Sequence, residues 1–128
     1  MERLQPPGWA RPKGYSNGIK AEGPFIFVAG QVGWDANQNF QSDSLVDQVR
    51  QALENVVDVL AEGGSGPDKI VRMTWYIEDK NAYLAATREI GEAYRDVIGD
   101  HYPAMTLFQV DELLEEGAKV EIEVTAEA

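Results

Sequence analysis

The segment Lys119-Val120-Glu121-Ile122-Glu123-Val124-Thr125-Ala126 alternates without a break between polar and apolar side chains. Successive side chains of a β-strand point to opposite faces, so a period of two predicts a strand that turns one face to the core. The predicted core face carries Val120, Ile122, Val124 and Ala126, and the other face carries Glu121, Glu123 and Thr125. This segment therefore predicts a sheet with one clearly apolar side.

Four more segments have the composition of strands. Residues 19–22 predict a short edge strand, and the continuous apolar run 25–29 predicts a strand that is buried on both faces. Pro103 precedes a further predicted strand over 104–110. In 70–77 one face should carry Val71, Met73, Trp75 and Ile77, and the other should carry Ile70, Arg72, Thr74 and Tyr76.

Two helices are predicted between these strands. Ser44 can cap the first, with Asp47 three residues on, and an apolar stripe runs from Leu45 to Leu60. The glycine-rich stretch 63–67 ends this helix. The second helix should span 81–98 as one piece, with Gly99 as its C-terminal cap.

The predicted order is β-β-α-β-α-β-β, which indicates an α+β domain spanning 1–128, preceded by an extended arm over 1–14. Two helices can cover only one face of the mixed sheet. Because several strands are apolar on both faces, we expect another copy of the chain to cover the second face.

Composition excludes several classes of function. The chain has 22 acidic and 11 basic residues and a formal charge of −11, which is unfavourable for binding nucleic acid or an anionic membrane. It has no cysteine and one histidine, so neither a thiolate site nor a multi-histidine metal site can form within one chain. With no apolar leader and no apolar run of membrane-spanning length, the sequence predicts a soluble, cytoplasmic protein.

Few residues are candidates for chemistry. His101 stands alone at a loop-to-strand junction, where a packing or surface role is favoured over general base catalysis. Glu121 and Glu123 share one face of the last strand. In a half-dry cleft their proximity would raise at least one pKa, which suits acid–base catalysis. The alternative, a solvated strand face, stays open.

Several segments together resemble the Rid family, also called the YjgF or enamine/imine deaminase family. The matching pieces are Gly14-Tyr15-Ser16, Val28-Ala29-Gly30-Gln31, the pattern Gln48, Ala52, Leu53, Asn55 and Leu60, Pro103-Ala104-x-Thr106, and the terminal strand. The resemblance implies a chorismate-mutase-like fold and a homotrimer whose sheets form an inner barrel. It also implies clefts between subunits that hydrolyse imines to keto acids and ammonia, without metal or organic cofactor.

Site residues follow from the resemblance one by one. It implies Glu121 as the catalytic acid or base, and a substrate-binding set of Tyr15, Gly30, Gln31, Arg88, Met105 and Leu107. Met105 stands where the family has an arginine that grips the substrate carboxylate, and a thioether cannot make such charged hydrogen bonds. Arg88 is either a solvated side chain or the replacement for that cation. Trp34 and Trp75 are candidates for cleft walls.

These departures predict a divergent hydrolase or deaminase for a small imine-, enamine- or amide-like metabolite, and not the standard deaminase of the smallest imino acids. The alternative is a trimer that binds a small metabolite without catalysis. A ribonuclease is the least favoured hypothesis, because of the charge and the absence of a histidine pair.

Overall fold

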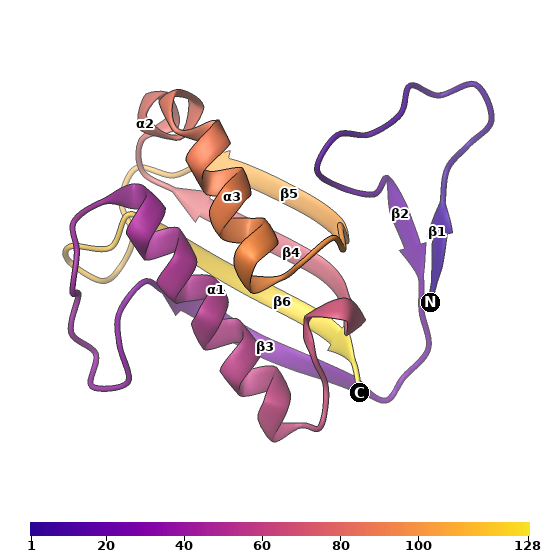
Figure 1. The fold of residues 1–128 in the computed structure, drawn as a ribbon, viewed down its shortest axis with the longest axis horizontal. Helices are drawn as coiled ribbons and strands as arrows, with labels where there is room; N and C mark the ends of the chain where they lie inside the picture. The colour runs from indigo at the N-terminus through magenta and orange to yellow at the C-terminus, as the bar shows by residue number, and fades with distance from the viewer.

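One four-stranded mixed sheet with helices on one side makes up the body of the protein, in a computed structural model that describes residues 1–128 (Figure 1). The strands are β1 (Glu2–Leu4), β2 (Gly18–Lys20), β3 (Phe25–Val32), β4 (Ile70–Ile77), β5 (Ala104–Gln109) and β6 (Val120–Glu127). The helices are α1 (Leu45–Glu62), α2 (Lys80–Ala85), α3 (Thr87–Val97) and the short 3-10 helix η1 (Pro67–Lys69). The predicted α+β class is confirmed. No helix is both long enough and apolar enough to cross a membrane.

The strand order is β3-β6-β4-β5, which places the alternating segment in the sheet interior. β6 runs antiparallel to both β3 and β4, and β4 runs parallel to the edge strand β5. The parallel pair needs a crossover, and α2 and α3 supply it. The predicted core face of β6 is confirmed, since Val120, Ile122, Val124 and Ala126 are all buried.

α1 begins where the sequence predicts, because the Ser44 side chain accepts a hydrogen bond from the Asp47 amide at 3.4 Å. The single helix predicted over 81–98 is wrong. Ala86 leaves helical geometry at φ −121° and ψ 18°, and separates α2 from α3. Both helices still pack on the core, α2 through Tyr83 and α3 through Ile90, Ala93 and Tyr94. Alanine is the best helix former, so the sequence carries no signal for this break.

Bulges change which residues share a face. In β4 the register shifts between Ile70 and Arg72, which adds one residue opposite β6. Ile70 is therefore fully buried in the core, and its predicted place on the face of Arg72 is wrong. A second bulge lies in β3 between Val28 and Gln31.

We call the sheet face turned away from the helices the open face. It carries Phe25, Phe27, Tyr76, Phe108, Glu121 and Glu123. All the helices pack on the other face (Figure 1), so within one chain β3 is covered on one face, and the burial of its second face by another copy stays a prediction. Phe27 is 76% exposed, and the Tyr76 and Phe108 rings, 5.4 Å apart, lie on the same face.

The segment 1–20 forms a hairpin that lies beside β5 (Figure 1). The predicted arm over 1–14 thus contains a strand, β1, which pairs with β2. The Ser16 amide donates to the Pro103 carbonyl at 3.0 Å, and the Ser16 hydroxyl donates to the Tyr102 carbonyl. These bonds attach the hairpin to the start of β5 and hold Tyr15 beside it.

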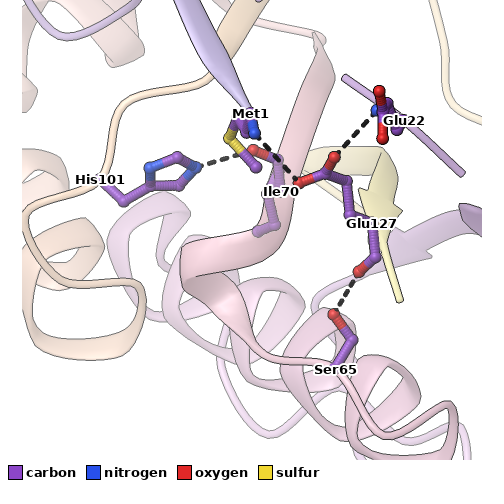
Figure 2. Close-up of polar contacts among 6 residues, drawn as sticks. All are labelled: Met1, Glu22, Ser65, Ile70, His101 and Glu127. Carbon is purple, nitrogen blue, oxygen red and sulfur yellow. Dashed lines mark hydrogen bonds and ion pairs between the residues drawn. The ribbon is translucent and has the colours of Figure 1, made fainter. Parts of the chain in front are cut away.

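Glu127 at the end of β6 contacts residues from several other segments of the chain (Figure 2). Its carboxylate accepts from the Glu22 amide at 3.0 Å and lies 3.9 Å from the Met1 amino nitrogen, and its carbonyl accepts from the Ser65 hydroxyl at 2.6 Å. Nearby, His101 Nε2 lies 2.7 Å from the Ile70 carbonyl, so the one histidine has a structural role.

Candidate functional site

Gly30 and Glu121 meet on the open face. A Cβ built on Gly30 would lie 2.8 Å from Cδ of Glu121 and 3.0 Å from Oε1, so any side chain at this position would force the carboxylate to move. The bulge in β3 reverses the alternation of that strand, which brings Gly30 to the same side as Glu121. The structure therefore brings together these two residues of the predicted site.

The two carboxylates on this face have different surroundings. Glu123 accepts a hydrogen bond from the Tyr76 hydroxyl at 2.7 Å, and this bond raises the pKa of Tyr76. Glu121 is half-buried and accepts no hydrogen bond within the chain. Burial, followed by the charges of Glu123 and Glu115, raises the pKa of Glu121 above its usual value. A carboxylate with a raised pKa is a stronger base than an ordinary glutamate, which suits it to accept and return a proton.

A second group of predicted residues lines a cavity of about 920 Å³ beneath the hairpin. Tyr15 comes from the hairpin and Met105 from β5. Aromatic side chains form much of the remaining wall: Trp9, Trp75, Tyr83, Tyr94 and Tyr102. Trp75 is 1% exposed, and its indole Nε1 is buried without a hydrogen-bond partner. Trp75 is therefore a core residue that also lines this cavity, and its place in the wall of a cleft between subunits stays a prediction.

The other predicted residues lie outside this cavity. Arg88 is on the solvent side of α3, with its side chain 86% exposed and its Nε 3.5 Å from Glu92, so within one chain it does not replace the missing arginine. Leu107 pairs with Trp75 in the β4–β5 ladder and packs against the core. Gln31 donates to the carbonyl of Ala29 at 3.0 Å.

The cavity also contains four cations that are not among the predicted site residues. Arg3, Arg11 and Lys13 reach it from the hairpin and Arg95 reaches it from α3, whereas Asp100 is its only acidic residue. A signal was present, because the first 20 residues are basic in a strongly acidic chain. That signal could not locate a site, since nothing local shows that a proline-rich arm folds back beside β5.

The two groups of predicted residues do not meet within one chain. Glu121 and Gly30 lie on the open face near the β3 edge, whereas Met105 lies on the helix-covered face at the β5 edge.

Trp34, the other residue proposed as a cleft wall, packs against Phe40 at 5.6 Å between ring centroids. No group of three or more His, Asp or Glu side chains is placed to hold a metal ion.

Comparisons with known proteins find relatives of this chain in sequence and in fold. A family model described as endoribonuclease L-PSP matches residues 9–128. A RutC family protein from Pyrococcus horikoshii is 32% identical over 113 residues, which cover 88% of this chain and 85% of that protein. The human 2-iminobutanoate/2-iminopropanoate deaminase is 28% identical over 79% of this chain and 71% of its own length. A solved Rid-family structure of unknown function from Yersinia pestis superposes with a TM-score of 0.86 at 28% identity, covering 99% of this chain and 98% of that one.

Proposed function

Because the chain belongs to the Rid (YjgF-like) family, which the endoribonuclease L-PSP model describes, we propose that it is a divergent hydrolase of the deaminase type. Its substrate is a small imine-, enamine- or amide-like metabolite, bound in a cleft between two copies of the chain. The observation that carries this proposal is the pairing of Gly30 with Glu121, a carboxyl with a raised pKa on an otherwise uncovered sheet face.

Glu121 supplies the acid–base chemistry. Its carboxylate takes a proton from a water molecule while the water oxygen adds to the imine carbon. The same group returns this proton to the nitrogen, which gives a carbinolamine. It then moves the proton of the new hydroxyl group to the amine nitrogen, the C–N bond breaks, and a carbonyl product and ammonia leave. A general acid–base residue of this kind contributes about 10²–10⁴-fold to the rate.

A cleft between copies accounts for the separation of the two groups. The sheet has free edges at β3 and β5, and each group lies near one of them. When the β5 side of one copy meets the β3 side of the next, the contact is head-to-tail, and a head-to-tail contact can close into a ring. The resemblance favours a ring of three. The exposed rings of Phe27 and Phe108 on the open face support an apolar contact there.

The test compares Glu121→Gln with Glu123→Gln, a matched change two residues away on the same face. Imines are generated from amino acids with an amino acid oxidase, and semicarbazide traps whatever imine remains. Keto acid formed above the spontaneous rate is then measured. Glu121→Gln should lose about a hundredfold in rate, and Glu123→Gln should stay within about threefold of the parent protein. Equal losses in both variants would contradict the acid–base role.

Met105 favours a second candidate, a protein that binds its metabolite without turning it over. β5 presents this thioether where the family's arginine would hold a carboxylate. This function would be supported by a ligand that binds stoichiometrically and is not hydrolysed, either by the parent protein or by Glu121→Gln.

A further inference from the structure

We propose that the cavity beneath the hairpin binds an organic anion with an aromatic body, whose negative charge is held by cations of the hairpin and α3 instead of by β5. This inference rests on the proposed function for the identity of the reacting group. It assigns the recognition of the anion to residues that the resemblance does not include.

Charge is distributed unevenly over the chain. The cavity is lined by Arg3, Arg11, Lys13 and Arg95 against the single acid Asp100, a formal excess of three positive charges. The rest of the chain has seven basic and 21 acidic residues. A concave surface lined by charge of one sign concentrates its field on the opening and attracts ligands of the opposite charge.

These cations have no partners of their own. The ion pairs of the chain involve Met1, Arg50 and Arg88. None of the four cavity cations forms an ion pair or donates a side-chain hydrogen bond. In an acidic protein, four unpaired cations around one cavity repel each other without compensation. An anionic ligand would supply that compensation, most strongly through the planar donors of the arginines.

Local features of α3 and of the hairpin position the cations at the cavity. A Cβ on Gly91 would lie 3.3 Å from Nη1 of Arg95, so the absence of a side chain at Gly91 lets the guanidinium lie along α3 at the cavity wall. On the opposite side, the bonds of Ser16 to the start of β5 hold the hairpin in place. The cations are therefore set by α3 and by a hairpin anchored at both Ser16 and Met1.

The side chains that line the cavity indicate that the uncharged part of the ligand is aromatic. Tyr15, Tyr83, Tyr94 and Trp75 offer ring faces and edges, and Met105 offers a thioether that packs well against an aromatic ring. A volume of about 920 Å³ is far larger than a two- to four-carbon imino acid needs.

Calorimetric titration with three probes tests the proposal on the full chain. Phenylpyruvate has the ring and the carboxylate, its methyl ester lacks the charge, and pyruvate lacks the ring. Phenylpyruvate should bind about tenfold or more tightly than either of the others, and its affinity should fall as salt is added. The double variant Arg11→Gln/Arg95→Gln should lose about tenfold in affinity for phenylpyruvate and little for the ester. Lys119→Gln removes an exposed cation at the far end of the sheet and should change neither affinity.

Two results would overturn the inference. One is equal binding of phenylpyruvate and its ester, or an equal loss in Lys119→Gln, because the cavity cations would then have no specific role. The other is dissociation of the assembly in the double variant, seen by light scattering, because the cations would then pair with acids of a neighbouring copy. Failure of the proposed function looks different: phenylpyruvate still binds as expected, but no imine is hydrolysed.

Discussion

Replacing Gln48 with leucine should lower the free energy of unfolding by about 3 kcal/mol, because this side chain joins two loops to α1. Gln48 is 1% exposed. Its Nε2 donates to the carbonyls of Ser42 at 3.0 Å and Gly117 at 2.9 Å, and its Oε1 accepts from the Lys119 amide at 2.8 Å. The loop that contains Gly117 and Lys119 leads directly into the strand that carries Glu121.

The magnitude follows from these three bonds. Each buried hydrogen bond contributes about 0.5–1.5 kcal/mol net, and a group left unpaired in the interior costs about 1–3 kcal/mol. Leucine restores apolar contact, and neither Ser42 nor Gly117 is buried, so we take a value near the middle of the range. For a chain of this length, about 3 kcal/mol corresponds to a fall in Tm of roughly 9–15 °C.

Gln51→Leu is the matched control. It makes the same chemical change one turn along α1, where the amide is half-exposed and donates only to Asn55 at 2.9 Å. Both variants are unfolded thermally at one protein concentration, because assembly makes Tm depend on concentration. The control should lose no more than about 1 kcal/mol. If Gln48→Leu lost no more than Gln51→Leu, the reasoning from the buried amide would be refuted.

Three further changes have expected outcomes. The raised pKa of Glu121 makes its ionised form unfavourable in the folded state, so the stability it contributes is complete at low pH and is lost as pH rises through the folded pKa. Glu121→Gln should therefore raise Tm more at about pH 8 than at about pH 4, and the opposite trend would contradict the burial argument. Met105→Arg should raise turnover of the pyruvate imine about tenfold or more in the coupled keto-acid assay, and no gain would mean that the guanidinium does not reach the substrate. Phe27→Asp should convert the assembly to monomers in light scattering, whereas Leu84→Asp on α2 should not, and an intact Phe27→Asp assembly would exclude the open face as the interface.

Regular patterns in the sequence predicted the regular parts of the fold. The alternation in β6 placed its four apolar residues in the core, and Ser44 marked the start of α1. Both signals are local, because one strand or one cap shows its environment in its own residues. The alternation also places Glu123 beside Glu121, and this charge is one of the causes that raise the pKa of Glu121, after burial and before Glu115.

Features that depend on distant segments were not predictable in this way. A bulge adds one residue against a partner strand, and nothing within β4 shows that Ile70 turns back to the core. The break at Ala86 occurs at a residue that favours helix. The cations Arg11 and Arg95 lie 84 positions apart in the sequence and meet only because the hairpin packs beside β5.

The bulge in β3 also determines which length changes the protein can tolerate. Residues two apart in a regular strand face the same side of the sheet. Val28 nevertheless faces α1 and Gly30 faces Glu121, because the bulge adds one residue between them and the next paired position. Ala29 and Gly30 together lie opposite the single residue Glu123, so deleting exposed Ala29 would remove no packed side chain and would leave an uninterrupted ladder. Gln31 would stay opposite Ile122 and Val32 opposite Glu121, so the residues that follow would keep their faces. In a library of single-residue deletions, this position should therefore be more tolerant than the core positions of the strand.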